Sequence, residues 1–349
     1  MHKNKFIALV ILLTMLSFII TACFGTADNS SEITKINIAA LRGPTGIGMV
    51  RMMDLMNNAN DELYINPDMA NFQGREVKRS YQFELLGAPE DVVAMVTGGQ
   101  VDIAAVPSNL ASVLYNATGG DILIAAIPTF GTLFMLENGE TVSDFRDLRG
   151  RTVYATGQGA NPEFILRHLL ESNGLTPGVD VEIEFLTEHA ELAALLAEGM
   201  VDIGMLPEPN ATAAQLLNND LRVIFDFTEE WNKTSDGNLA MTAVIARREF
   251  AENNPDALDN FLFDLKNSIE FAINDVPKAA ELCAEFGVIP QAAAAARAIP
   301  NISLTFISGT SMQQVIEPYL KVLHTANPQS VGGYVPNEAI YYIPQTPIE

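Results

Sequence analysis

The feature of the sequence that most limits its fold is a phrase that occurs twice, 100 residues apart. VDIAAVPSN occupies residues 101–109, and VDIGMLPEPN occupies residues 201–210. Each phrase follows a helix-forming stretch that ends in a glycine turn. INIAALRGPTG and TVYATGQGANP, which begin at Ile36 and Thr152, also correspond as strand, glycine loop and helix. The phrase alone is a generic buried strand that chance can produce, but the matching flanks predict two similar α/β units.

Strands alternate with helices along most of the chain, which predicts an α/β fold with mainly parallel sheets. A chain of 349 residues also has the length of two domains. We expect strands at residues 35–41, 81–86, 101–106, 122–127, 133–137, 151–155, 181–186, 201–206, 221–227 and 241–247. We expect helices at residues 46–58, 89–98, 163–172, 189–199 and 211–217, one after residue 107, and three or four over residues 254–323.

The first 23 residues have the pattern of an export signal. Lys3 and Lys5 precede FIALVILLTMLSFII, an apolar run of 15 residues that is shorter than the roughly 20 needed to cross a bilayer. The following ITAC resembles a bacterial lipobox, which implies cleavage after Ala22 and lipidation of Cys23. The alternatives are an ordinary signal peptide with a chance cysteine, or an uncleaved anchor. We expect a signal peptide at residues 1–22 and a lipidated tether at residues 23–34.

Charge and cysteine content exclude several function classes. Forty-three acidic residues against twenty Lys and Arg give a net charge of −23, and no basic cluster offers a surface for nucleic acid. Cys283 is the one cysteine besides Cys23, so a lipidated chain has no intrachain disulfide and no thiolate metal set. The four histidines lack ligand spacing. We expect no metal, no cofactor and no nucleic acid partner.

The loops that follow the repeated strands are the candidate binding site, because ligands of open α/β sheets lie at the carboxyl ends of the strands. Glycines there allow backbone N–H groups to approach a ligand, and helix N-termini add partial positive charge. GQGANP lacks the third glycine of a dinucleotide fingerprint. We predict that these ligand-binding residues line one cleft: Arg42, Gly43, Pro44, Thr45, Gly46, Pro107, Ser108, Asn109, Gly157, Gly159, Ala160, Asn161, Glu188, His189, Pro207 and Glu208.

Several of these residues have a second interpretation. Arg42 is either an anion contact or a solvated loop cation, and Thr45, Ser108 and Asn109 are typical caps of their own helices. His189 suits neutral hydrogen bonding better than metal binding, and Glu208 suits an amine or a ring N–H. Three aromatic residues are candidates either for stacking on a ligand ring or for core packing: Phe130, Tyr154 and Trp231.

These segments resemble the solute-binding lipoproteins of bacterial ABC importers, in the NMT1/THI5-like branch that includes sulfonate, nitrate, taurine and thiamine-pyrimidine binding proteins. The stretches that carry the resemblance are LRGPTGIGMVRMMD, VDIAAVPSNLASVLYN, DLRGRTVYATGQGANPEFIL, TEHAEL and VDIGMLPEPN. The resemblance implies a two-lobed periplasmic-binding-protein (type II, venus-flytrap) fold that closes on a small polar or anionic molecule. It further implies a monomer, anchored by lipid on the extracytoplasmic face of the cell membrane, that docks on an ABC permease.

The resemblance also implies domain boundaries and an alternative function. Lobe I would comprise residues 35–129 and 238–349, and lobe II residues 130–237, with crossings near residues 128–131 and 236–240. Enzymes with this fold, similar to pyrimidine synthases or menaquinone-pathway proteins, are the alternative. The cysteine-rich motif of the synthases is missing from this chain, so we expect no enzyme activity.

Overall fold

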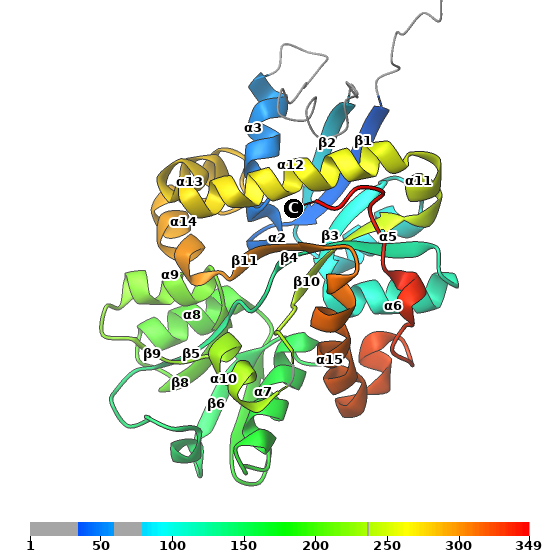
Figure 1. Cartoon of the computed structure of the whole chain (residues 1–349). Coiled ribbons are helices and arrows are strands. Elements are labelled where there is room, and N and C mark those ends of the chain that lie inside the picture. The colour runs from blue at the N-terminus through cyan, green and yellow to red at the C-terminus, as the bar shows by residue number, and fades with distance from the viewer. Residues whose placement is uncertain (1–33, 59–78, 236, 349) are drawn as a thin grey trace, which may run out of the picture. The chain divides into compact units, whose positions relative to one another are not determined.

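The computed structural model describes residues 34–58, 79–235 and 237–348, which fall in one compact unit, Thr34–Glu349 (Figure 1). The signal segment with Cys23 and nearly all of the tether lie outside the described residues. Two sheets form the scaffold. The first sheet contains β1 (Thr34–Leu41), β2 (Arg79–Leu86), β3 (Ile103–Pro107), β4 (Ile122–Thr129), β10 (Thr242–Arg247) and β11 (Leu304–Ser308). The second contains β5 (Leu133–Glu137), β6 (Thr152–Thr156), β7 (Glu182–Leu186), β8 (Ile203–Pro207) and β9 (Arg222–Asp226).

The strand orders of the two sheets confirm the internal repeat. The first sheet has the order β11-β4-β10-β3-β1-β2, and the second has β9-β5-β8-β6-β7 when written in the same direction. The repeated phrases form β3 and β8, which occupy equivalent places and both end at proline. Beside them lie β10 and β5, each antiparallel to its neighbours, so each sheet contains one reversed strand that comes from outside its repeat.

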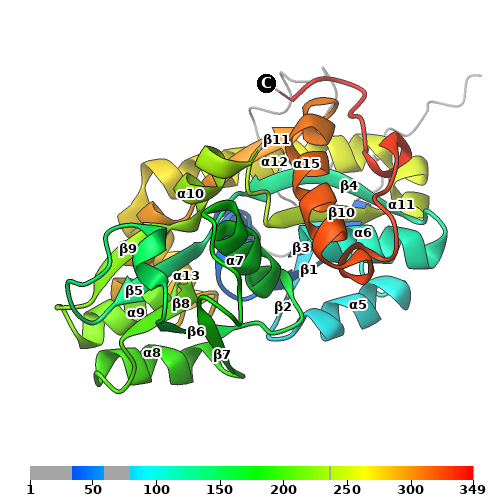
Figure 2. The same cartoon turned by 90° about the horizontal axis from the view of Figure 1, so that it is seen from below.

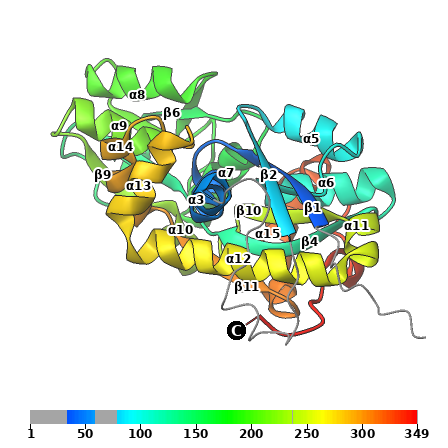
Figure 3. The ribbon, with the colours of Figure 1, turned by 90° about the horizontal axis from the view of Figure 1, so that it is seen from above.

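Helices cover both faces of each sheet (Figures 2 and 3). On the first sheet, α5 (Pro89–Thr97), α6 (Ser108–Thr118) and α15 (Ser311–Ala326) pack on one face. The other face carries α3 (Val50–Asn58), α12 (Pro255–Asn274) and α13 (Val276–Glu285). On the second sheet, α7 (Asn161–Ser172) and α10 (Phe227–Thr234) lie opposite α8 (His189–Ala197) and α9 (Asn210–Leu217). The remaining helices are α2 (Pro44–Ile47), α11 (Arg248–Asn253) and α14 (Ala292–Ala298).

Side-chain alternation explains how one strand serves both faces of the first sheet. In β1, Ile36 and Ile38 join the core under α12, whereas Ala39 joins the core under α5. All eight residues of β4 are buried, as expected of a strand covered on both faces. No described helix is long and apolar enough to cross a membrane.

Two local predictions need correction. The helix expected over residues 46–58 is divided into α2 and α3 at Gly48, where a Cβ atom would come within 2.9 Å of the Ile269 side chain of α12. Close packing on α12 therefore accounts for a glycine at this position. The sequence interpretation also missed α10 and β11, which are short elements placed by their contacts with other strands and helices.

Candidate functional site

The strand-end loops of both sheets meet at a cleft of about 420 Å³. Its lining consists of Leu41, Arg42, Gly43, Pro44, Thr45, Pro89, Glu90, Pro107, Asn109, Leu110, Thr132, Ala160, Asn161, Pro162, His189, Pro207, Glu208, Pro209, Asn210, Met241 and Thr242. The loops approach each other closely, since a Cβ atom on Gly43 would lie 3.8 Å from Cδ of Pro209. The cleft therefore joins the corresponding loops of the two repeats.

Most of the predicted site residues line this cleft, but five do not: Gly46, Ser108, Gly157, Gly159 and Glu188. Gly46 is buried against Val288, and Ser108 is fully buried. Gly157 lines a separate hollow with Phe185 and Leu186.

Sequence reasoning missed two kinds of lining residue. The first kind comes from the chain segments beside the crossings between the sheets: Thr132, Met241 and Thr242. The predicted crossing points were the signal in the sequence that could have identified them. The others flank predicted loops or begin predicted helices: Leu41, Pro89, Glu90, Leu110, Pro162, Pro209 and Asn210. The rule that ligands lie at the carboxyl ends of the strands, if extended to the neighbours of the predicted loops, would have identified this second group.

Besides the one-turn α2, five helices of both sheets start at the cleft: α5, α6, α7, α8 and α9. No side chain caps the N-termini of α5, α6, α7 and α8, whereas the Thr212 N–H in the first turn of α9 donates to Glu208 Oε2. Backbone N–H groups of a first turn have no partner within the helix and carry partial positive charge. The cleft thus offers hydrogen-bond donors from the backbone of both repeats.

The capping role expected for Thr45, Ser108 and Asn109 is wrong. Thr45 Oγ1 donates to the Leu41 carbonyl at 2.6 Å, and Ser108 Oγ donates to the Ala240 carbonyl at 2.5 Å. Asn109 Nδ2 donates to the Ser330 carbonyl at 2.9 Å. These side chains donate to carbonyl groups of distant or preceding segments, and no side-chain hydrogen bond caps the N-terminus of α2 or α6.

His189 is held as a neutral ring at the start of α8. Its Nδ1 lies 2.6 Å from Oγ1 of the buried Thr156. Burial lowers the pKa of His189 and outweighs the opposing charge of Glu188. An imidazole with a lowered pKa is uncharged at neutral pH, so it contributes hydrogen bonding rather than positive charge.

Glu208 has its carboxylate oxygens already engaged. Oε1 accepts from Asn301 Nδ2 at 2.8 Å and from Thr212 Oγ1 at 2.9 Å, and Oε2 accepts from the Thr212 N–H at 3.1 Å. Its residue exposure is 2%, and burial raises its pKa despite these hydrogen bonds. Its observed role is to join α9 to the segment that carries Asn301.

Arg42 directs its charge to the border of the cleft. Its Nη1 donates to the carbonyl of Gly287 at 2.8 Å, and the side chain is exposed. Gly287 is not a lining residue, and Arg42 also lines a separate surface hollow with Glu84 and Phe286. The guanidinium therefore has a backbone partner at the end of α13.

Asn161 is the buried polar residue of the cleft without a complete set of partners. It begins α7, its exposure is 5%, and its buried Oδ1 has no hydrogen-bond partner among the described residues. Buried polar atoms are nearly always paired in native proteins. The same oxygen is closed to solvent, so Asn161 lines the cleft without exposing Oδ1 to it.

The three candidate aromatic residues do not line the cleft. Trp231 is fully buried, with its ring centroid 5.6 Å from that of Tyr319 and 5.0 Å from that of His168. Phe130 and Tyr154 pack against the hydrophobic cores. Of the two interpretations, the structure therefore supports core packing.

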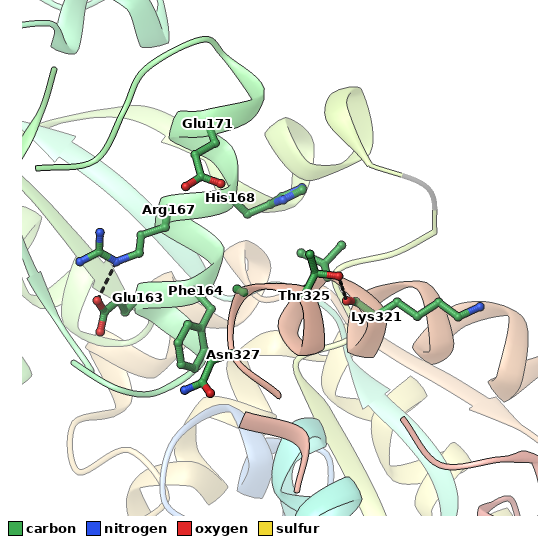
Figure 4. A pocket seen from close by; sticks show the side chains of 10 residues that line it. Glu163, Phe164, Arg167, His168, Glu171, Lys321, Thr325 and Asn327 are labelled. Carbon is green, nitrogen blue, oxygen red and sulfur yellow. Dashed lines mark hydrogen bonds and ion pairs between the residues drawn. The ribbon is translucent and has the colours of Figure 1, made fainter. Parts of the chain in front are cut away.

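A larger hollow of about 730 Å³ lies between α7 and α15 (Figure 4). Its lining mixes both signs of charge with apolar side chains, and Arg167 Nε donates to Glu163 Oε1 at 2.7 Å. None of the residues predicted to bind a ligand lines it.

Residues 82–280 match the family model described as NMT1/THI5 like. The chain belongs to the NMT1/THI5-like family. A comparison with curated proteins gave no match.

Solved structures of transport proteins share the fold of this family member. An ABC transporter protein from Parabacteroides distasonis is 22% identical with a TM-score of 0.70, covering 89% of this chain and 100% of its own. The periplasmic aliphatic sulphonate binding protein SsuA from Escherichia coli is 17% identical with a TM-score of 0.66, covering 89% and 93%. The alkanesulfonate-binding protein SsuA from Xanthomonas axonopodis, bound to MOPS, is 16% identical with a TM-score of 0.58, covering 88% and 96%. The predicted α/β periplasmic-binding-protein fold is confirmed.

Proposed function

We propose that this NMT1/THI5-like protein is an extracytoplasmic solute-binding lipoprotein. It would capture a small polar or anionic organic molecule in the cleft and deliver it to an ABC permease in the membrane. The observation that carries the proposal is the convergence on one cleft of equivalent strand-end loops and of four helix N-termini without side-chain caps. The transport proteins with the same fold support it, since two of them bind sulfonates by name.

The proposed movement is closure of two lobes about the crossing segments. Lobe I would comprise residues 35–129 and 238–349, and lobe II residues 130–237. In support, β1–β4, β10 and β11 share one sheet, and β5–β9 share the other. Thr132 and Thr242 line the cleft beside the two crossings, so a hinge there would open or close the ligand site directly.

A binding role accounts for the cleft better than the enzyme alternative does. Cys283, the remaining thiol after lipidation of Cys23, is fully buried outside the cleft. Burial raises the pKa of its thiol to about 12, which leaves it protonated and unreactive at neutral pH.

Native mass spectrometry of the protein purified gently from its host tests this proposal. We expect a noncovalent small molecule at one copy per monomer, which is released unchanged on denaturation. Turnover of that molecule by the protein, or empty protein from every growth medium together with no binding in a broad solute screen, would contradict a solute-binding role.

A further inference from the structure

His189 differs from the other described histidines in the ring nitrogen that is left without a partner. His168 Nε2 lies 2.7 Å from a serine hydroxyl, and His324 Nε2 lies 3.2 Å from a backbone carbonyl oxygen. His189 uses Nδ1 instead, which lies 2.6 Å from Oγ1 of Thr156. Its half-buried ring leaves Nε2 open to solvent and without a hydrogen-bond partner among the described residues.

The hydroxyl of Thr156 fixes the tautomer of this ring. Thr156 is fully buried, and His189 Nδ1 is the one partner of its Oγ1 within the part of the chain that the structure describes. If Nδ1 carried the ring proton, the hydroxyl hydrogen would have no acceptor, which is costly for a buried group. Thr156 therefore donates to Nδ1, and the proton of the neutral ring is on Nε2.

The Nε2–H group is on the side of the ring that a bound molecule can reach. His189 begins α8 and lines the cleft, whereas its Nδ1 is turned to the buried end of β6. Nδ1 and Nε2 are on different edges of an imidazole, so the edge with Nε2 is turned away from Thr156. This neutral ring therefore offers the cleft a fixed hydrogen-bond donor.

The first repeat has no such donor at the equivalent place. Leu41 of β1 takes the place of Thr156 of β6, because each pairs with the last residue of the neighbouring parallel strand. Pro89 begins α5 as His189 begins α8, 100 residues later. Leu41 and Pro89 both line the cleft. The cleft thus has an apolar surface from one repeat where the other repeat supplies a donor.

We infer that His189 is a specificity-determining residue, which donates its Nε2–H to an acceptor oxygen of the ligand, and that Thr156 is the positioning residue that fixes this donor. The ligand class is a small molecule with a carbonyl or sulfonyl oxygen at one end and hydrocarbon at the other. The oxygen lies at His189, and the hydrocarbon lies against Leu41 and Pro89. The inference rests on the proposed solute-binding function and adds the orientation of the ligand to it.

Nitrogen NMR of the full-length protein, labelled in its histidines, measures the tautomer directly at pH 7.5. The chain has four histidines, and His189→Leu identifies the signals of His189. We expect a ring protonated at Nε2 in the natural protein and in Thr156→Ser. Thr156→Val, which lacks the hydroxyl, should show a larger share of the Nδ1-protonated form. A ring protonated at Nδ1 in the natural protein, or an unchanged spectrum in Thr156→Val, would overturn the role of Thr156.

Two small probes test the donor in the cleft. Dimethyl sulfone and methanesulfonate both carry sulfonyl oxygens and no donor, and the first is uncharged whereas the second is an anion. We expect each probe to shift the Nε2 resonance of His189. His189→Leu should weaken their binding about three- to tenfold in NMR titrations, as one net hydrogen bond predicts. His189→Gln, whose side-chain amide also donates, should retain most of the binding.

The matched control is His324→Leu, because His324 lies outside the cleft. Equal weakening by His189→Leu and His324→Leu, or binding that leaves the Nε2 resonance unmoved, would overturn the inference and still support a solute-binding cleft. Absence of binding by both probes would also overturn it, since the inferred ligand class includes them. The molecule that co-purifies in native mass spectrometry decides the solute-binding function separately.

Discussion

At the residue scale, a buried ion pair joins the first sheet to its longest covering helix. Arg79 of β2 is 1% exposed, and its Nε lies 2.8 Å from Oδ2 of Asp264 on α12. Tyr81 donates its hydroxyl to the same oxygen at 2.6 Å. Removing one member of such a buried pair takes away a partner of a charge that has almost no access to water, which costs far more than the pair itself contributes.

We therefore expect Asp264→Ala to lower the free energy of unfolding by about 3–5 kcal/mol. Urea denaturation followed by circular dichroism measures it. Glu281→Ala is the control, because Glu281 pairs with Lys278 on the surface at 2.9 Å and should change little. Similar losses for the two variants would show that Asp264 is not an energetic anchor.

Glu208 predicts a pH dependence of stability with a definite sign. Burial raises its pKa above the ordinary 4.5, so the folded state binds this proton more tightly than the unfolded state. The contribution of Glu208 to the free energy of unfolding is therefore complete below pH 4.5, and it is lost as the pH rises through the raised folded-state pKa.

Glu208→Gln removes this titration while keeping the shape of the side chain. We expect the variant to gain stability relative to the natural protein as the pH rises from 4.5 toward neutrality. Urea unfolding over a series of pH values gives both curves, and Glu281→Gln serves as an exposed control. Parallel curves for Glu208→Gln and the natural protein would refute the prediction.

At the element scale, the two repeats differ where strand and helix pack. Ala104 of β3 corresponds to Gly204 of β8. A Cβ atom on Gly204 would lie 2.7 Å from Cδ1 of Leu196 and 3.3 Å from Cδ1 of Leu192, both on α8. The second repeat thus uses glycine where two leucines of α8 approach the strand.

Gly204→Ala should therefore destabilise the protein by about 1–3 kcal/mol through overpacking, although alanine stands at the equivalent place in the first repeat. Thermal unfolding monitors the change. Gly87→Ala is the matched control, because a Cβ atom there would meet nothing within 4 Å. A neutral Gly204→Ala would show that the leucines of α8 move aside without cost.

The elements also show how far sequence reasoning reached. Periodicity and glycine turns were sufficient to predict β3, β8 and the helices around them from the sequence, because these signals depend only on neighbouring residues. Ser108 resembled a cap by the same local reasoning, yet its hydroxyl bonds to Ala240, a residue 132 positions away. Nothing near Ser108 in the sequence predicts that partner.

At the scale of the whole molecule, the proposed anchor predicts where the protein resides in the cell. Cys23→Ser should prevent lipidation and release the processed protein from the membrane fraction, because one cysteine carries all of the acyl chains. Immunoblots of membrane and soluble fractions, with intact-mass measurement, test it, and Cys283→Ser is the control. Membrane retention of the Cys23→Ser protein without lipid would favour the uncleaved-anchor alternative.

The sequence by itself determined the repeat, the alternation of strands and helices, and the loops that line the cleft. Each of these depends on local periodicity or on the rule that parallel strands end at one edge of a sheet. Only the tertiary structure decided which side chains remain available there. Asn301 lies 93 residues from Glu208 and engages its carboxylate, and Gly287 lies 245 residues from Arg42 and engages its guanidinium. Such partners arise from folding in three dimensions, which is why the chemistry of the cleft, unlike its position, was not predictable from the sequence.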